Sequence, residues 1–367
     1  MSKRIVFIFT IVCSLLNGCH QESPPSSTQQ DSQSKSSITP ENPCTYLRQD
    51  IQHIDNRSTV ESLEKVNSRL KQCLPQLSLN DRTLLIYATT AMYQRFLFAD
   101  RTPEQQQYFE QYAINTSAYP TLQQNYESHF SRRDQYLIEH QSNAAYYELY
   151  DAGNNKTKYR RQPSYLRDIF APFLPAAEQM FIINLARQNE QPVISDNTFN
   201  LTWQEIADRA QFWESYTISY PNSIFFEDAQ RLKFAYTRFL FHGLPNMPIS
   251  TNYEGEENIH PEALKEIQAL ANNGHSQLSE KAMKFLKFIE IPVTTRDLKL
   301  PIELSPVEQR SKRAETIKDM KQLDQYIGLY DPLSFDSTHI NRDCFSDSIC
   351  VTHLGSISTS FSTKQDF

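Results

Sequence analysis

Residues 211–241 read QFWESYTISYPNSIFFEDAQRLKFAYTRFLF, and the fold class is clearest in this stretch. Pro221 cannot continue a helix, and Ser223 is a residue type that caps the start of the next one. After that turn, apolar residues recur at helical spacing and define one face that packs back on the first helix: Phe225, Ala229, Leu232, Tyr236 and Leu240. The stretch therefore predicts two helices joined by a short turn.

The glycine count extends this prediction to the whole chain. Only seven glycines occur in 367 residues, whereas average usage is about 7%. Hairpin turns, bulges and phosphate-binding loops all use glycine. We therefore expect an all-α fold, an array of antiparallel helix pairs arranged as an irregular bundle or an α-solenoid.

Helical periodicity and start and stop signals predict further helices along the chain. Ser58 and Glu61 suggest a capping box, Ser305 and Glu308 suggest another, and Gly243 and Gly328 are stop signals. The expected helices cover residues 45–55, 58–73, 80–98, a stretch opening at 102–103, 133–150, 164–171, 174–189, 202–219, 224–242, 260–272, 276–290 and 306–327.

The segment 211–241 also resembles the tetratricopeptide-like helix pairs of envelope lipoproteins. The resemblance is carried by Trp213 and Tyr216 in the first helix, by residues 220–223 (YPNS) at the turn, and by Ala229 in the second helix. No clean 34-residue repeat recurs elsewhere. An ordinary helical hairpin therefore stays open as the alternative to a repeat array.

The N-terminus has the features of an export signal. Lys3 and Arg4 precede an apolar run, residues 5–16, that is too short for a bilayer span of roughly 20 residues. The run leads into LNGC at residues 16–19, which resembles the lipobox of bacterial lipoproteins, although Asn17 is bulkier than the usual residue. An ordinary signal peptide with an incidental cysteine is the alternative.

This resemblance implies a lipid anchor and an address. Cleavage would leave Cys19 as the mature N-terminus, with a diacylglycerol on its sulfur and a further acyl (palmitate-type) chain on its nitrogen, which makes membrane attachment stable. Because His20 rather than Asp follows the cysteine, the resemblance implies the outer membrane of a Gram-negative cell, with the body most naturally in the periplasm.

The rest of the chain divides by composition. Residues 1–18 are the predicted signal peptide, and residues 19–43 are the lipidated cysteine and a Ser-, Gln- and Pro-rich tether that cannot form a core. Residues 44–329 are the predicted helical domain, and residues 330–367 are a Ser-, Asp- and Thr-rich irregular segment.

Four cysteines remain in the predicted mature body: Cys44, Cys73, Cys344 and Cys350. Four cysteines allow three connectivities. The helices 45–55 and 58–73 would form a hairpin with Cys44 and Cys73 at its open end, and the short spacing of the other two suits a small closed loop. We therefore expect disulfides 44–73 and 344–350, which fit an oxidising compartment.

Charge and motifs limit the possible functions. The formal net charge of −7 becomes −9 when Lys3 and Arg4 leave with the signal, so we expect no nucleic-acid partner. No phosphate-loop, dinucleotide, nucleophile-elbow or HExxH motif occurs. We expect no cofactor and no metal. The strongest metal candidate is a tail cluster that a solvated loop explains as well: Asp336, His339, Asp343 and Asp347.

The most unusual local composition lies at residues 146–167, where tyrosines alternate with basic residues in an acidic chain. Aromatic faces and basic groups together can hold a carboxylate or an acidic partner. We expect a helix to end near Gly153 and the basic residues to follow on an exposed loop. The candidate binding residues are Tyr147, Tyr150, Lys158, Tyr159, Arg160 and Arg161. The alternative is that the tyrosines pack in the core and the basic side chains are merely solvated.

Two functions therefore stay open. The favoured one is a membrane-anchored, non-enzymatic binding or scaffold protein of the cell envelope, with a protein or peptidoglycan partner held in a groove between helix pairs. The alternative is a cell-wall-active hydrolase or transglycosylase without a recognisable motif. Glu127-Ser128 and Glu214-Ser215 match the Glu-Ser pair of lytic transglycosylases, but the Gly-Leu-Met-Gln stretch of that family is missing.

Overall fold

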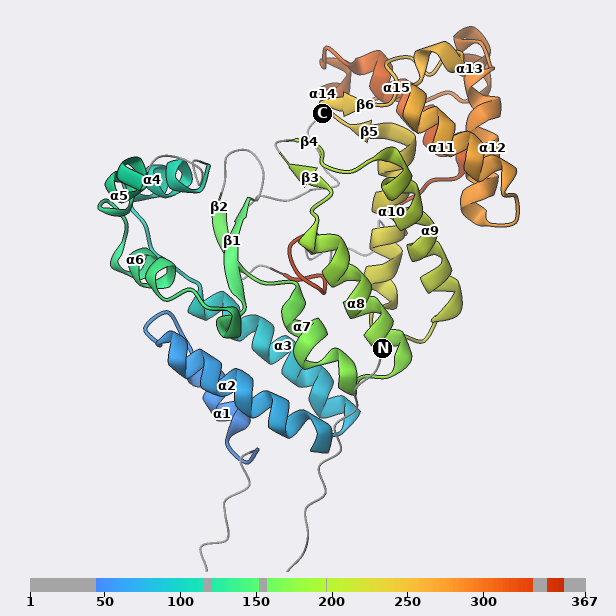
Figure 1. The fold of residues 1–367 in the computed structure, drawn as a ribbon. Coiled ribbons are helices and arrows are strands. Elements are labelled where there is room, and N and C mark those ends of the chain that lie inside the picture. Colours follow the sequence, from blue (N-terminus) through green and yellow to red (C-terminus); the bar gives the residue numbers. More distant parts are fainter. Residues whose placement is uncertain (1–43, 115–119, 152–156, 196, 333–341, 353–367) are drawn as a thin grey trace, which may run out of the picture. The chain divides into compact units, whose positions relative to one another are not determined.

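The structure is a computed structural model that describes residues 44–114, 120–151, 157–195, 197–332 and 342–352 (Figure 1). Across these ranges the chain forms fifteen α-helices, and its strands occur only as three two-stranded antiparallel hairpins. The prediction of an all-α fold is confirmed. The predicted signal peptide, Cys19 and the tether lie outside the described residues.

The first three helices are close to those expected. They are α1 (Leu47–His53), α2 (Val60–Cys73) and α3 (Leu79–Phe96). Thr59, not Ser58, caps α2, and its side chain accepts a hydrogen bond from the Ser62 N–H. The Cys44–Cys73 disulfide joins the open end of the α1–α2 hairpin, as predicted.

The next region contains the largest error of the sequence prediction. The helices here are α4 (Pro103–Ile114), α5 (Pro120–Glu127) and α6 (Arg132–Glu139). The helix expected over 133–150 ends at Glu139, and the chain then forms a hairpin of β1 (Tyr147–Asp151) and β2 (Thr157–Arg161). Tyr146 has a left-handed backbone (φ 52°), which interrupts a helix, and the tyrosine-rich residues after it favour a strand.

The helix pair expected over 211–241 is present. After α7 (Ser164–Ile169) and α8 (Ala176–Glu190), the chain forms α9 (Trp203–Ser219) and α10 (Phe226–His242), which lie side by side. The Ser223 hydroxyl bonds to the Tyr216 hydroxyl at 2.8 Å, and the Phe225 N–H donates to the Ser223 hydroxyl. Ser223 therefore bonds within the turn, but the N-cap of α10 is Phe225, which has no side-chain cap, so the expected capping role of Ser223 is wrong. A repeat array stays a prediction.

The last helices are α11 (Pro261–Asn272), α12 (Gln277–Ile289), α13 (Val293–Lys299), α14 (Pro306–Gln309) and α15 (Ala314–Ile327). The single helix expected over 306–327 is broken into α14 and α15, and α13 was not predicted. The remaining strands form two minimal hairpins, β3 (Ile194–Ser195) with β4 (Thr198–Phe199), and β5 (Gly243–Leu244) with β6 (Met247–Pro248).

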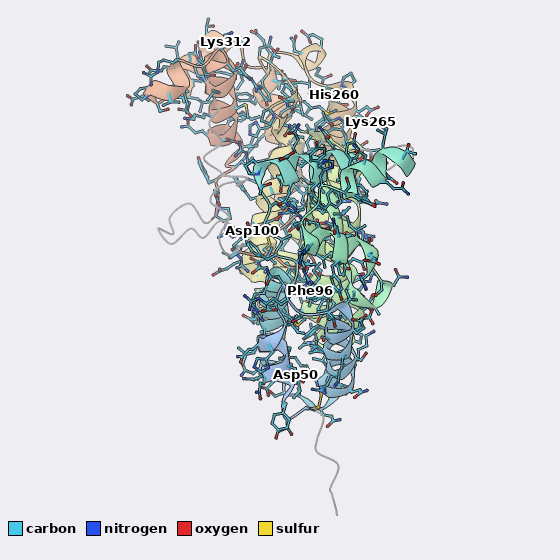
Figure 2. The ribbon with its side chains drawn as sticks, turned by 90° about the vertical axis from the view of Figure 1, so that its left-hand side faces the viewer. Asp50, Phe96, Asp100, His260, Lys265 and Lys312 are labelled. Carbon is cyan, nitrogen blue, oxygen red and sulfur yellow. A yellow bond between two sulfur atoms is a disulfide. The ribbon has the colours of Figure 1, made fainter. Side chains whose placement is uncertain are left out.

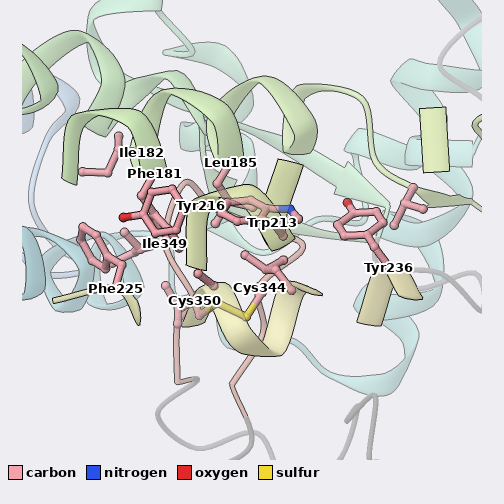
Figure 3. Close-up of a cluster of buried hydrophobic side chains, with 14 of the residues drawn as sticks. Phe181, Ile182, Leu185, Trp213, Tyr216, Phe225, Tyr236, Cys344, Ile349 and Cys350 are labelled. Atoms are coloured by element: carbon pink, nitrogen blue, oxygen red, sulfur yellow. A yellow bond between two sulfur atoms is a disulfide. The ribbon is translucent and has the colours of Figure 1, made fainter. Parts of the chain in front are cut away.

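The longer helices bury one face and leave charged residues on the other. Phe96 of α3 is fully buried, whereas Lys265 of α11 and Lys312 before α15 are exposed (Figure 2). In the core between α8, α9 and α10, Phe181 stacks on Phe225 with ring centroids 4.6 Å apart, and it lies 5.2 Å from Trp213 (Figure 3).

The segment around the second disulfide belongs to this core. Cys344 and Cys350 are bonded, as predicted, and both are almost completely buried beside α8, α9 and α10 (Figure 3). Ser348 and Ile349 are also buried. We call residues 342–352 the C-terminal plug. It is irregular, as expected, but it packs as an interior element and not as a surface tail.

Asp228 links this plug to α10 and makes a pH prediction possible. Its carboxylate pairs with Arg342 at 3.0 Å, but burial outweighs that pairing and raises the pKa of Asp228 to about 6. An unfolded aspartate has a pKa of about 3.9. The contribution of Asp228 to stability is therefore complete below pH 4 and is lost as the pH rises through 6.

We expect the unfolding free energy of the Asp228→Asn variant to increase relative to that of the wild type as the pH rises. The difference in unfolding free energy should move in favour of the variant by about 2 kcal/mol between pH 4 and pH 7, which is most of the effect of a shift of about two pKa units at about 1.36 kcal/mol each. Urea unfolding at several pH values measures it. Glu227→Gln, at the exposed neighbouring position, is the control and should show little change. A pH-independent difference for Asp228→Asn would contradict the prediction.

Candidate functional site

The tyrosines of the predicted binding segment lie on the β1–β2 hairpin and pack mainly inward. Tyr147 is buried, and its hydroxyl donates to the Leu137 carbonyl at 2.7 Å. Tyr159 is half-buried with its ring 5.3 Å from that of Phe109, and burial raises its pKa. The Tyr150 ring lies under the Arg160 guanidinium at 4.1 Å. Tyr147 therefore agrees with the alternative interpretation, in which the tyrosines pack in the core.

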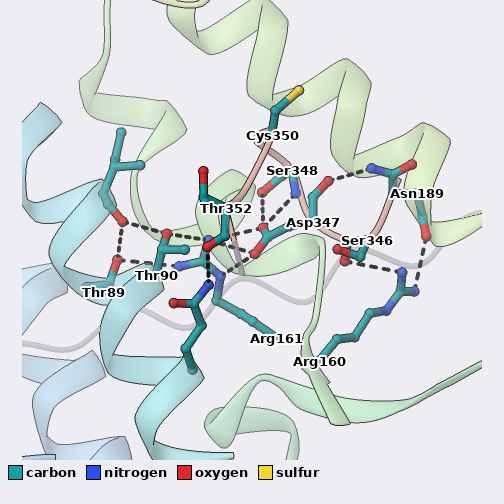
Figure 4. Close-up of polar contacts among 12 residues, drawn as sticks. Thr89, Thr90, Arg160, Arg161, Asn189, Ser346, Asp347, Ser348, Cys350 and Thr352 are labelled. Carbon is teal, nitrogen blue, oxygen red and sulfur yellow. Dashed lines mark hydrogen bonds and ion pairs between the residues drawn. The ribbon is translucent and has the colours of Figure 1, made fainter. Parts of the chain in front are cut away.

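Arg160 is paired within the protein. Its guanidinium donates to Glu148, directly opposite on β1, at 2.7 Å. It also donates to the Ser346 carbonyl at 3.3 Å and to the Asn189 carbonyl at 3.1 Å (Figure 4). The side chain therefore joins the hairpin to the plug and to the end of α8.

Arg161 is buried and holds the plug more directly. Two of its nitrogens donate to the two carboxylate oxygens of Asp347, each at 3.1 Å, and a third contact reaches the Thr90 hydroxyl at 3.0 Å (Figure 4). Asn189 adds donations to the Cys344 and Asp347 carbonyls at 2.9 and 2.5 Å. The expectation that the arginines sit on an exposed loop is wrong, because the hairpin turns them toward the plug.

Lys158 is the last of the six candidate binding residues. It is half-buried opposite Tyr150 on the hairpin, and burial lowers its pKa while Asp343 opposes that effect. A ligand-binding role for Tyr147, Tyr150, Lys158, Tyr159, Arg160 and Arg161 remains a prediction. Their visible contacts are internal, and three of the six bond to the C-terminal plug: Tyr150, Arg160 and Arg161.

A different place has the geometry of a binding site. A pocket of about 170 Å³ lies between the α9–α10 pair, the start of α12 and the segment after α15. Its lining combines charged, amide and apolar side chains, namely Glu214, Gln230, Lys233, Phe234, Thr237, Gln277, Leu278, Lys281, Leu329, Tyr330 and Pro332, together with Gly328. We call it the α9–α12 pocket.

Glu214 forms the acidic part of the pocket. It is buried on α9, and its Oε1 accepts a hydrogen bond from the Leu278 N–H at 2.7 Å. That N–H belongs to the first turn of α12, whose N-cap is Ser276. The first-turn amides of a helix have no partner within the helix and favour a carboxylate. Glu214 therefore fastens α9 to the start of α12.

Lys281 contributes a positive charge to the pocket, and it also binds the backbone carbonyls at the C-terminal end of α15. Its ammonium donates to the Ile327 carbonyl at 3.0 Å and the Gly328 carbonyl at 2.5 Å. Gly328 has φ 67°, the left-handed conformation typical of a residue that ends a helix. Burial lowers the pKa of Lys281, and the nearby Lys284 and Lys233 lower it further. An anion bound here would reverse the effect of this repulsion.

Lys233 is the second basic group. It lies half-buried on α10, and within the described ranges its ammonium has neither a hydrogen bond nor an ion pair. Two ammonium groups that repel each other in a small recess, one of them unpaired, are suited to hold a negatively charged group.

Sequence reasoning missed this pocket almost entirely. The sequence marks Glu214 only through the Glu-Ser dipeptide, and it marks neither Lys233 nor Lys281. The three residues come from three helices, and nothing in their local sequence marks them. Only the packing of α12 against α9 brings them together.

The predicted metal cluster is divided. Asp336 and His339 lie outside the described residues, while Asp347 is occupied by Arg161 and Asp343 accepts the Phe345 N–H at 2.8 Å. Within the described ranges no group of three metal-binding side chains occurs, and no described helix is long and apolar enough to cross a membrane.

Comparison with known proteins does not assign the chain to a family. No protein-family model matches the chain, and searches of curated proteins and of solved structures found no significant match.

Proposed function

We propose that this chain is a lipid-anchored, non-enzymatic binding protein of the cell envelope, and that its ligand places a negatively charged group in the α9–α12 pocket. The observation that carries the proposal is the unpaired ammonium of Lys233 beside the partly desolvated Lys281. Both charges act in a recess where water screens them less than on an open surface.

The cellular location in this proposal rests on the N-terminal sequence. The lipobox-like residues 16–19 and the polar tether support export and attachment to the outer membrane, with the body in the periplasm. Two disulfides in the body agree with an oxidising compartment. The partner would be a protein or peptidoglycan component that carries a carboxylate or another anion.

Replacement of Cys19 by alanine should release the protein from the membrane. The variant loses the sulfur that would carry the diacylglycerol, so a loss of nearly all membrane fractionation and of radiolabelled-palmitate incorporation is expected. Cys13→Ala, inside the apolar run, is the matched control and should leave both unchanged. Continued labelling of the Cys19→Ala variant would contradict the lipid anchor.

Reversal of Lys233 to glutamate should remove anion binding by the pocket. At an effective dielectric constant of 20, unit charges 4 Å apart interact with about 4 kcal/mol, so a reversal weakens acetate binding by well over tenfold. NMR titration of the purified body with acetate measures this. Lys287→Glu is the control, because Lys287 is exposed on the same helix as Lys281 but does not line the pocket. Equal effects of the two variants would indicate only general surface electrostatics.

An enzymatic function is the second candidate, because Glu214 of the Glu-Ser pair lines this pocket. Glycosidases usually work with two carboxyl groups, and Glu214 is the one carboxyl group in the described lining. Incubation with purified peptidoglycan separates the two functions. Release of soluble fragments by the wild type and its loss in Glu214→Gln would favour the enzyme, whereas no release by the wild type agrees with a binding protein.

A further inference from the structure

The α9–α12 pocket has charges of both signs, and this limits its ligand beyond a simple anion. Glu214 uses Oε1 for the Leu278 N–H, and its Oε2 has no partner within the described ranges. A carboxylate can accept about four hydrogen bonds. A ligand that was only an anion would therefore lie beside a carboxylate that has acceptor capacity left for a donor.

A ligand with an ammonium group as well as a carboxylate satisfies both sides of the pocket. Resting on the function proposed above, we infer that the α9–α12 pocket binds a free α-amino acid with an apolar side chain. The ligand carboxylate pairs with Lys233 and with the remaining N–H of Lys281, and the ligand ammonium donates to Oε2 of Glu214.

The size of the pocket agrees with a single amino acid. Its volume of about 170 Å³ is smaller than the roughly 300–1,000 Å³ of sites for drug-sized ligands. A sugar-peptide unit would project far outside such a recess, whereas an amino acid fits within it. The free carboxylate and free ammonium of an unlinked amino acid also distinguish it from a residue inside a peptide.

The apolar side chain follows from the rest of the lining. Phe234 is half-buried, Leu278 and Leu329 are buried, and Tyr330 is 65% exposed beside them. A large aromatic side chain so exposed at the rim of a pocket can cover a ligand, because it loses little conformational freedom when it packs. These groups provide contacts for an aliphatic or aromatic side chain of the ligand.

A panel of three leucine derivatives tests the inference on the folded body. The probes are L-leucine, N-acetyl-L-leucine, which has no ammonium, and L-leucinamide, which has no carboxylate. Binding is measured by NMR titration to wild type, Lys233→Ala and Glu214→Gln. We expect leucine to bind the wild type at least about tenfold more tightly than either derivative, because a buried charge left without its partner is costly.

Each variant should test one charged group of the ligand, Lys233→Ala the carboxylate and Glu214→Gln the ammonium. Lys233→Ala should weaken leucine and acetyl-leucine but leave leucinamide unchanged. Glu214→Gln keeps an acceptor for the Leu278 N–H, and it should remove the preference for leucine over acetyl-leucine. If that variant unfolds, the panel on the wild type alone still decides the question.

The outcomes distinguish this inference from the proposed function. Acetyl-leucine that binds the wild type as tightly as leucine, in a manner that needs Lys233, would overturn the amino-acid inference and leave the anion site standing. Failure of both leucine and acetyl-leucine to bind the wild type would overturn the amino-acid inference, and so would equal binding of both to wild type and Lys233→Ala. If acetate behaves in the same way, the proposed anion site is wrong as well.

Discussion

The Arg161→Ala variant is expected to lose about 3–5 kcal/mol of unfolding free energy, the usual cost of removing one partner from a buried ion pair. Arg161 is 3% exposed and Asp347 is 6% exposed, with nitrogen and oxygen 2.9 Å apart at closest approach. Without the guanidinium, the Asp347 carboxylate would be buried with only the Ser348 N–H and hydroxyl to bind it. The C-terminal plug would then lose its main attachment to the hairpin.

Urea unfolding of the purified body measures this effect, with Arg167→Ala as the matched control. Arg167 pairs with the carboxylates of Asp168 and Glu190, but it is partly exposed. Exposed pairs contribute about 0–1 kcal/mol. The double variant Arg161→Met with Asp347→Leu should recover part of the loss, since it leaves no unpaired charge. A loss below 1 kcal/mol in Arg161→Ala would mean that the plug is held by its apolar contacts alone.

Removal of the Cys44–Cys73 disulfide should have an effect of similar size. The two cysteines are 29 residues apart in sequence, and those of the second disulfide are six apart. The chain-entropy relation assigns about 3–4 kcal/mol to the longer loop and about 2 kcal/mol to the shorter one. Both estimates describe the restriction of the unfolded chain, so alanine substitutions are the suitable change.

Guanidinium unfolding of the double variants Cys44→Ala with Cys73→Ala, and Cys344→Ala with Cys350→Ala, tests that order. A larger loss from the shorter loop would show that the second disulfide stabilises mainly by keeping the plug in its folded conformation within the core. That result would identify native packing, rather than chain entropy, as the dominant contribution at this position.

Parts of the site were accessible from the sequence, and others were not. The unusual composition of residues 146–167 correctly marked a segment with a special role, but the role visible in the structure is internal. The misplaced helix over 133–150 explains the error, because a helix followed by a loop exposes Arg160 and Arg161, whereas the β1–β2 hairpin directs them to Ser346 and Asp347. A short tyrosine-rich stretch does not distinguish helix from strand by periodicity alone.

The sequence by itself determined the features that depend on neighbouring residues. Scarce glycine and helical periodicity predicted an all-α body, Ser305 and Glu308 form the expected capping box, and the α1–α2 hairpin placed Cys44 beside Cys73. Tertiary structure alone decided the rest. Asp347 is 186 residues from Arg161, and the Leu278 N–H is 64 residues from Glu214. A charge cannot signal through local sequence which distant helix will bury it, so the plug and the α9–α12 pocket appear only when the helices pack.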